Sequence, residues 1–488
     1  MKKQKIIANT INNREAIQSR ASQPSILNPT FSLRQFATLL SLPYLFPTGI
    51  FFHDIAYDSR KVKPGDLFIA LSGECVDGHD FIADAEQAGA VALLISRPVQ
   101  TKLPYFIVPN VLEALGRLAS DWRHQFRIPV IAVTGSNGKT TTKNMITSIL
   151  SIAAGSADYC LATQGNQNTE ITLPIQLLHL NESHRYTVLE MGMSHFGEIE
   201  RLSRIAKPSI VVIVNAFPSH LAGVGGTIEG VARAKGEIFS GLLESGTAVL
   251  NADSEFCALW RQLALDKKIV TFGLEKHADI SAKNIKLTSK NSCFTLISRK
   301  GSIDIQLPLL GRHNLCNALA AAAVCLAAGI ELPTIKIGLE RIETTNRRLE
   351  IMPAINGASI IDDSYNANPA STHAAIDVLA TQPGRKILVL GDMRELGPDE
   401  KRYHAEMGDY ARQQGIDDLF CVGELMKEAV KHFGPHAQHF VSKEALIVAL
   451  KPLLHEMVTV LVKGSRSMRM DEVREQCVLK PEKENPFV

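Results

Sequence analysis

The sequence lacks the features that mark membrane-spanning, secreted and nucleic-acid-binding proteins. Its longest apolar run, residues 318–330, is shorter than the about 20 residues of a membrane span, so we expect no integral membrane contact. Lys and Arg number 52 against 50 Asp and Glu, and this near-neutral balance gives no reason to expect a nucleic-acid partner. The eight cysteines include no C-x-x-C pair for zinc and are typical of a reducing cytoplasm. Small molecules are therefore the expected partners.

Residues 1–30 also lack the apolar core of a secretory signal. They are polar and basic, and we expect a flexible tail on a cytoplasmic protein. A transit peptide is the alternative, because the segment contains Arg and Ser and little acid.

The rest of the chain contains three regions with strand and helix patterns, and its 45% hydrophobic content suffices for three cores. Residues 31–127 predict a small N-terminal α/β domain. Residues 128–346 alternate buried strand patterns with helical ones, which predicts an ATPase-like parallel sheet. Residues 347–488 show a doubly wound, Rossmann-like pattern. The predicted fold class is therefore α/β with three domains.

The stretch 131–144, IAVTGSNGKTTTKN, predicts a phosphate-binding loop between a strand and a helix. Free backbone N–H groups and the positive end of the helix would face an anion there. Lys139 would reach the terminal phosphates and the Thr140 hydroxyl would bind Mg²⁺. The common loop G-x-x-x-x-G-K-[ST] is two residues longer, since only Ser136 and Asn137 separate Gly135 from Gly138 here.

The loop has three alternative interpretations. The first is a plain turn between strand and helix. A dinucleotide-binding fold would need G-x-G-x-x-G, and the nearest candidate, GVGGTIEG, has Ile228 in place of the third glycine. A GTPase would carry N-K-x-D, which is absent. The sequence thus favours ATP.

Residues at the ends of neighbouring strands should face the same crevice. Glu190 ends one strand pattern, and Asn215 ends the next with His220 following shortly after. Glu190 and His220 could hold Mg²⁺, although this ion prefers oxygen ligands to imidazole. A histidine in a solvated loop is the alternative for His220.

Lys235 lies on an apolar helical stripe with Ile228, Val231, Ile238 and Leu242. Such a lysine usually extends its ammonium to water. If it is desolvated instead, its pKa falls and a neutral amine becomes available for chemistry.

The shortened loop resembles that of the Mur ligases and folylpolyglutamate synthases, which form amide bonds at the expense of ATP and whose loop is equally short. Further resemblances run from residue 58 to residue 468. They are DSRKVKPGDLFIAL, DGHDF, GNQNTEITLP, EMGMSHFGEI, GRHNLCNALAA, DDSYNANPAS, GDMRELG and VKGSRSM. Within this family the motifs resemble those of the ligase type that completes the peptide stem of a cell-wall precursor. A ligase adding the third residue would carry D-N-P-R, and a folylpolyglutamate synthase would lack the early DSRKVKPGDLF segment.

The resemblance implies a cytoplasmic, monomeric ligase that joins D-alanyl-D-alanine to UDP-N-acetylmuramoyl-tripeptide through an acyl phosphate. It implies ATP and two Mg²⁺ ions as cofactors. Thr140, Glu190 and His220 are the implied metal ligands, and Lys235 matches a lysine that becomes a carbamate and helps hold the second ion. The implied catalytic residues are Lys139, Lys235 and Arg348.

The resemblance also assigns binding residues. For the nucleotide they are Gly135, Ser136, Asn137, Gly138, Lys139, Thr140, Thr141, Asn314, Asn317, Arg348 and Asp363, with Tyr365 and Asn366 at the same edge. For the muramyl substrate they are Ser59, Arg60, Asn166, Asn168, Lys463, Ser465 and Arg466. Ordinary alternatives are a helix cap for Asn314 and a solvated basic turn for residues 463–466.

Two other functions stay open from the sequence. One is a ligase of the same family with a different acceptor. The other is a non-catalytic nucleotide switch, which has no evident use for GDMRELG or VKGSRSM. No short motif distinguishes diaminopimelate from lysine as the third residue of the tripeptide.

Overall fold

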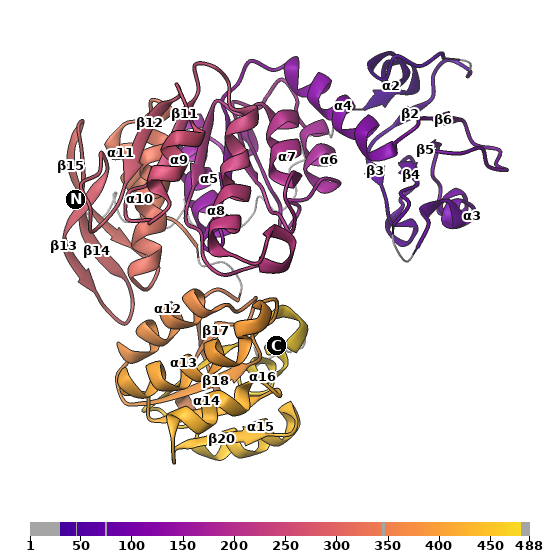
Figure 1. Ribbon diagram of the computed structural model, residues 1–488. Helices are drawn as coiled ribbons and strands as arrows, with labels where there is room; N and C mark the ends of the chain where they lie inside the picture. The colour runs from indigo at the N-terminus through magenta and orange to yellow at the C-terminus, as the bar shows by residue number, and fades with distance from the viewer. Residues whose placement is uncertain (1–29, 45, 74–75, 344–346, 480–488) are drawn as a thin grey trace, which may run out of the picture. The chain divides into compact units, whose positions relative to one another are not determined.

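The computed structural model describes residues 30–44, 46–73, 76–343 and 347–479 (Figure 1). Nearly all of the predicted tail lies outside them. The chain forms two compact units: one extends to Leu118 and includes Leu178–Glu182, and the other holds Ala119–Leu177 and the chain from Ser183 onward. The predicted boundaries after residues 127 and 346 stay predictions, because residues on both sides of 346 belong to the second unit.

The first unit is built on a four-stranded parallel sheet in the order β3-β4-β5-β6. Its strands are β3 (Ile55–Ala56), β4 (Leu67–Ile69), β5 (Ala92–Ile95) and β6 (Tyr105–Ile107). The other elements are β1 (Phe31–Ser32), β2 (Phe51–Phe52), α2 (Leu33–Leu39), α3 (Ile82–Gln87) and the start of α4 (Val111–His124). Helix α2 begins after Ser32, whose hydroxyl forms a capping box with Gln35. The predicted small α/β arrangement is confirmed.

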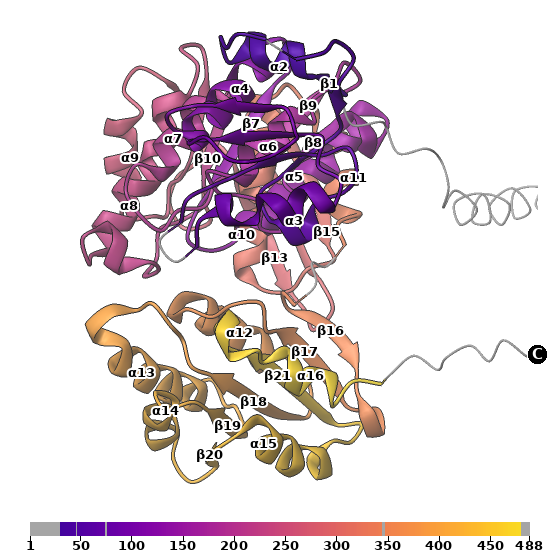
Figure 2. The same cartoon turned by 90° about the vertical axis from the view of Figure 1, so that its right-hand side faces the viewer.

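The second unit contains a six-stranded parallel sheet in the order β12-β11-β10-β7-β9-β8. Its strands are β7 (Val130–Thr134), β8 (Cys160–Ala162), β9 (Tyr186–Glu190), β10 (Ile210–Ile213), β11 (Thr247–Asn251) and β12 (Lys268–Phe272). Strands β7, β9 and β10 lie side by side (Figure 2). The ends of these three strands therefore share one edge, as the parallel-sheet pattern predicted.

The helices of this part of the second unit bury apolar residues against the sheet or against one another. They are α5 (Lys139–Ala154), α6 (Thr172–Leu178), α7 (Glu198–Ala206), α8 (Ile228–Gly236), α9 (Cys257–Leu263), α10 (Arg312–Ala327) and α11 (Leu332–Glu340). Helix α10 contains the alanine-rich run, and most of its residues are buried because small side chains allow close packing on every side.

Residues 281–307 form a three-stranded antiparallel sheet that the strand and helix alternation did not predict. Its strands are β13 (Ser281–Leu287), β14 (Ser292–Ser298) and β15 (Gly301–Leu307). Phe294, Leu296 and Ile305 alternate with polar residues and pack into the same core as α10 and α11. This period of two is typical of a sheet with one solvated face.

The rest of the second unit holds a mixed sheet in the order β16-β17-β21-β18-β19-β20. Its strands are β16 (Glu350–Pro353), β17 (Ser359–Asp363), β18 (Arg385–Gly391), β19 (Asp418–Val422), β20 (Ala437–Phe440) and β21 (Val458–Lys463). Only the edge strand β16 is antiparallel to its neighbour, and the predicted doubly wound pattern is confirmed for the others.

Alternate residues of these strands pack against helices on opposite faces (Figure 2). The helices are α12 (Pro369–Ala380), α13 (Glu400–Gln413) and α14 (Met426–Phe433) on one face, and α15 (Lys443–Leu450) and α16 (Asp471–Glu475) on the other. On β18, Leu388 faces the first group and Ile387 the second. A strand buried on both faces needs such a continuous apolar run.

Within the described parts of the chain, none of the helices combines the length and the apolar character needed to cross a membrane.

Candidate active site

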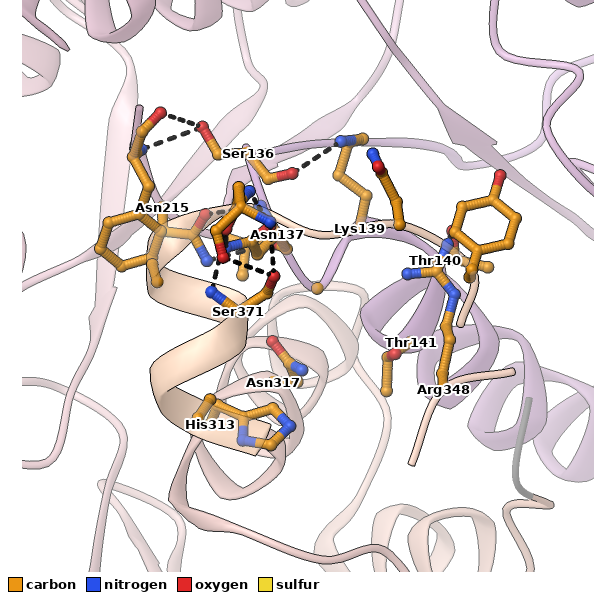
Figure 3. A pocket seen from close by; sticks show the side chains of 18 of the residues that line it. Ser136, Asn137, Lys139, Thr140, Thr141, Asn215, His313, Asn317, Arg348 and Ser371 are labelled. Atoms are coloured by element: carbon orange, nitrogen blue, oxygen red, sulfur yellow. Dashed lines mark hydrogen bonds between the residues drawn. The ribbon is translucent and has the colours of Figure 1, made fainter. Parts of the chain in front are cut away.

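The predicted phosphate loop connects the buried strand β7 to α5. Lys139 is the first residue of α5, and its ammonium donates to the loop carbonyls of Gly135 at 2.7 Å and Ser136 at 3.2 Å (Figure 3). Burial lowers the pKa of Lys139, and Glu190 partly opposes this shift while Arg348 adds to it. In the part of the chain that the structure describes, carbonyl oxygens of the loop are therefore the only direct partners of this ammonium.

Gly138 fixes the turn into α5 for two reasons. Its φ of +76° lies in the left-handed region, which favours glycine. A Cβ atom at this position would lie 2.4 Å from Asn317 Oδ1 on α10. The loop therefore touches the predicted adenine-side residue Asn317 directly.

Thr140 and Glu190 meet below the loop. The Thr140 hydroxyl donates to Glu190 Oε2 at 2.8 Å, and Asn168 Nδ2 donates to Glu190 Oε1 at 2.8 Å. Arg348 Nη2 donates to the Thr140 oxygen at 3.1 Å, and its guanidinium lies 4.2 Å from the centre of the Tyr365 ring. Figure 3 shows Thr140 and Arg348 together on one side of the cavity, with Asn215 on the other. Residues distant in sequence thus form a small charged network.

The oxygens of Thr140 and Glu190 fit a magnesium ion. Both are hard oxygen donors, and the carboxylate of Glu190 is only 3% exposed. His220 instead pairs with Glu395, its Nδ1 lying 2.8 Å from Oε2. Burial lowers the pKa of His220 despite the opposing carboxylate of Glu395. Among the described residues, no group of three or more His, Cys, Asp or Glu side chains is placed to hold a metal.

Lys235 lies in the last turn of α8 and is 3% exposed. No hydrogen bond or ion pair of its ammonium is found in the described part of the chain. Burial lowers its pKa well below the usual value, and the charge of Lys139 lowers it further. The side chain is therefore largely desolvated. The predicted helix is also too long, since α8 ends at Gly236 and continues as a 3₁₀ turn (Glu237–Gly241).

Asp363 and Lys463 form a buried ion pair at the ends of β17 and β21. Lys463 Nζ lies 2.5 Å from Asp363 Oδ2 and donates to the Asn366 carbonyl at 2.9 Å. Burial raises the pKa of Asp363, and Lys463 partly offsets this rise. The strands pair in register at these two residues, which explains why the charges meet.

The first turn of α10 presents polar side chains to the same cavity. The helix begins at Arg312 after Gly311, so the alternative of Asn314 as its cap is wrong. Asn314 Nδ2 donates to Leu310 O at 2.8 Å, and its Oδ1 accepts from Asn317 Nδ2 at 3.1 Å. His313 is neutral, because burial lowers its pKa to about 4.

These groups line one cavity of about 370 Å³. The predicted site residues that it brings together are Ser136, Asn137, Gly138, Lys139, Thr140, Thr141, Asn168, Glu190, His220, Asn314, Asn317, Arg348, Asp363, Tyr365, Asn366 and Lys463.

Other predicted site residues do not line the cavity. Ser59 and Arg60 belong to the first unit, where the exposed guanidinium of Arg60 binds Asp58 at 2.8 Å. Asn166 is exposed beside Asn168, and Ser465 is buried and accepts from Arg394 N at 2.8 Å. The remaining three are Gly135, Lys235 and Arg466.

Several lining residues were not predicted as binding residues, including Asn215, Phe217, Asn251, His313 and Asn368. Asn215 and Asn251 lie at or just past the ends of β10 and β11. The strand-end rule predicted that Asn215 faces this crevice without giving it a role, and the same rule could have assigned Asn251. His313 is adjacent to Asn314 in the quoted motif. No sequence signal distinguishes Asn368 from an ordinary helix cap before Pro369.

Family models match most of the chain. The Mur ligase middle domain matches residues 133–325, the Mur ligase glutamate ligase domain residues 347–466, and the Mur ligase family catalytic domain residues 51–123.

Characterised relatives cover nearly the same length. The UDP-N-acetylmuramoyl-tripeptide–D-alanyl-D-alanine ligase of Escherichia coli is 42% identical over 86% of this chain and 92% of its own. The ligase of the same name from Bacillus subtilis is 37% identical over 88% and 94%.

Solved structures agree with this similarity. A crystal structure of MurF from Acinetobacter baumannii superposes with a TM-score of 0.86 at 33% identity, covering 92% of this chain and 99% of that one. MurF ligase from Thermotoga maritima in complex with ADP gives a TM-score of 0.78 at 28% identity, covering 87% and 96%. Together with the loop and the charged cavity, these matches show that the chain belongs to the Mur ligase family.

Proposed function

We propose that this chain is an ATP-dependent ligase that joins D-alanyl-D-alanine to UDP-N-acetylmuramoyl-tripeptide, with UDP-N-acetylmuramoyl-pentapeptide, ADP and phosphate as products. The observation that carries the proposal is the similarity to ligases of that name, which extends through all three matched regions. The cavity supports it, because the phosphate loop, the half-buried Lys139 and Arg348 converge there. The cytoplasmic location and the monomeric state stay predictions.

The chemistry requires activation of a carboxylate that does not condense with an amine unaided. In the proposed reaction the terminal carboxylate of the tripeptide attacks the γ-phosphorus of ATP, and ADP departs as the new O–P bond forms. The amine of D-alanyl-D-alanine then attacks the acyl carbon, loses a proton and displaces phosphate. Both steps concentrate negative charge on phosphoryl oxygens.

Lys139 and Arg348 are proposed to stabilise this charge. A phosphate chain over the loop would compete with the carbonyls of Gly135 and Ser136 for the Lys139 ammonium, since an anion forms the stronger hydrogen bond. The hydrogen bond to Thr140 and the Tyr365 ring hold Arg348 in place. A prepositioned cation in a buried site stabilises developing charge without reorganisation.

Thr140 and Glu190 would hold one magnesium ion, which supplies positive charge to the phosphate oxygens when bound. Asn168 orients the carboxylate of Glu190 through its amide. The proposed second site uses His220 and a carbamate of Lys235. A carbamate forms when a neutral amine attacks CO2 and loses a proton, and the lowered pKa of Lys235 meets this requirement.

The remaining binding residues keep their proposed roles. Asp363 would contact the ribose, and Asn314 and Asn317 the adenine, with the neutral ring of His313 beside them. Ser59 and Arg60 would bind the uridine end, and Asn166, Asn168, Lys463, Ser465 and Arg466 the muramyl peptide. Lys463 is already paired with Asp363, so a substrate carboxylate there would have to share its ammonium.

Phosphate release from ATP with Mg²⁺ tests the proposal. UDP-N-acetylmuramoyl-tripeptide and D-alanyl-D-alanine are each omitted in turn, and the product is identified by mass. Release only with both substrates, with a pentapeptide product, is expected. Release with neither, or with another acceptor, would remove the substrate assignment. Comparing diaminopimelate and lysine tripeptides identifies the preferred third residue.

A further inference from the structure

Asn137, in the middle of the phosphate loop, is held by two other asparagines. Its backbone N donates to Asn215 Oδ1 at 2.9 Å, and Asn215 Nδ2 donates to its carbonyl at 3.1 Å. Its side-chain Nδ2 donates to Asn368 Oδ1 at 3.0 Å, and Asn368 Nδ2 donates to its Oδ1 at 2.7 Å. All four polar groups of Asn137 therefore have an asparagine partner. Figure 3 shows Asn137 between Asn215 and Ser371.

The two asparagine partners of Asn137 lie beside different sheets. Asn215 follows β10, the neighbour of β7, so it belongs to the same sheet edge as the loop. Asn368 is separated from Asn137 by 231 positions and precedes α12, which packs against the mixed sheet. The reciprocal amide pair is thus a direct connection from the phosphate loop to α12.

The Oδ1 atom of Asn368 accepts a second hydrogen bond. Its donor is Ser371 N at 2.9 Å, and this bond caps α12. The two lone pairs of one oxygen therefore serve the helix and the loop together. A change in the position of Asn137 changes the environment of the cap, because both bonds depend on one side-chain rotamer.

We infer that Asn368 is a positioning residue that couples occupancy of the phosphate loop to the first turn of α12. The inference rests on the proposed function in assuming that a nucleotide binds this loop. Phosphate oxygens that bind the loop N–H groups hold Asn137 in one conformation. The paired amide of Asn368 then orders the cap of α12, whose residues Ala370, Ser371 and Ala374 line the same cavity.

Coupling of this kind is reciprocal. If nucleotide orders the cap of α12, then an intact amide pair must also strengthen nucleotide binding by the same factor. Hydrogen bonds between uncharged groups contribute modest net free energies, so we expect a factor of about three to ten.

The first test measures hydrogen exchange of the α12 amides in the full-length protein, with and without ADP. The amides of Ser371 and Thr372 report on the cap, since both donate to Asn368. ADP should slow their exchange in the wild-type protein. In Asn137→Ala, at an ADP concentration that saturates the variant, this slowing should disappear although the substitution lies 231 positions from Asn368.

Two variants distinguish loss of the Asn137–Asn368 hydrogen bonds from loss of a helix cap. In Asn368→Ser the serine hydroxyl still caps α12 but is too short to reach Asn137. Ser442→Ala is the matched control, because Ser442 caps α15 through Ala445 N at 3.2 Å and has no contact with the loop. Asn368→Ser should weaken ADP binding about threefold to tenfold, and Ser442→Ala should leave it unchanged.

A double variant completes the design. If the amide pair acts as a unit, Asn137→Ala combined with Asn368→Ser should weaken ADP binding no more than either change alone. Additive effects, or undiminished slowing of exchange in Asn137→Ala, would overturn the inference. If the wild-type protein does not ligate the two substrates but ADP still slows exchange in α12, only the proposed substrates are wrong. If the wild-type protein does not bind ADP, both the proposed function and the coupling through Asn368 are wrong.

Discussion

Two lysines in the second unit are buried to nearly the same extent but differ in what their ammonium groups contact. Lys463 ends β21 and is 2% exposed, with its ammonium 2.5 Å from the Asp363 carboxylate. Lys235 on α8 is 3% exposed, and in the described residues its ammonium has no recorded hydrogen bond or ion pair. Burial lowers the pKa of Lys235 well below its usual value.

The difference between the two lysines is one of charge compensation: the proposed substrate residue Lys463 has a carboxylate partner, and Lys235 has none among the described residues. A buried cation with a carboxylate beside it keeps its charge, and removing either partner leaves an uncompensated ion. A buried lysine without a partner loses its proton more readily and becomes a nucleophile. Lys139 is intermediate, because only carbonyl oxygens contact its ammonium. We therefore expect changes at Lys139 and Lys235 to reduce activity, and changes at Lys463 to reduce stability.

The largest expected effect is that of Lys139→Ala. Loss of a prepositioned cation at the transferred phosphoryl group should lower kcat by at least about a hundredfold. The free energy of unfolding should stay nearly equal, because the ammonium of this half-buried lysine contacts only two loop carbonyls in the described residues. Steady-state phosphate release and denaturant unfolding measure the two quantities. Lys401→Ala, on the exposed face of α13, serves as the control, and full activity of Lys139→Ala would contradict the loop assignment.

Lys235→Ala should reduce kcat by roughly tenfold or more, since a charged metal ligand would be lost. Short carboxylates such as acetate or formate should restore part of the activity, because they can occupy the space of the missing carbamate. The rescue is measured as the ratio of rates with and without added carboxylate, with chloride at equal ionic strength as the control. Absence of rescue at every concentration would leave Lys235 as a packing residue.

Lys463→Met should destabilise the protein by about 3–5 kcal/mol, because the Asp363 carboxylate would stay buried without its cation. Guanidinium unfolding measures the change. The double variant Lys463→Met with Asp363→Leu should recover most of the loss, since it removes both charges. Lys235→Met is the matched comparison and should be neutral or stabilising. If Lys463→Met and Lys235→Met lower the free energy of unfolding equally, the proposed difference in charge compensation between the two residues is wrong.

The smaller of the two expected stability effects concerns His313, whose pKa is lowered to about 4 by burial and by the nearby charge of Lys463. The ordinary value is 6.5, so the stability that this histidine contributes is present above pH 6.5 and is lost as the pH falls through 4. Between pH 7 and pH 4, the free energy of unfolding of His313→Gln should fall by roughly 2 kcal/mol less than that of the wild-type protein. Unfolding curves at several pH values measure the slope, and an unchanged slope would show that His313 is not desolvated.

Local signals in the sequence predicted the elements that depend on neighbouring residues. Gly135 and Gly138 between a β-branched strand and a helix gave the loop, and the apolar runs gave β7, β9 and β18. The antiparallel sheet β13–β15 was missed, because its amphipathic strands follow an α/β pattern and carry no signal of a change in topology. The end of α8 was also misplaced, since the apolar stripe continues into a 3₁₀ turn.

The sequence by itself determined the phosphate loop, the doubly wound pattern and the family, because each depends on residue types at short, fixed spacing. Only the tertiary structure decided which charges are compensated. The sequence around Lys463 does not indicate a carboxylate partner, and the residue acquires one because β17 and β21 pair in register. The connection between Asn137 and Asn368 spans 231 positions and exists only in the folded chain. Free energies of burial depend on such distant partners, and spacing along the chain does not encode them.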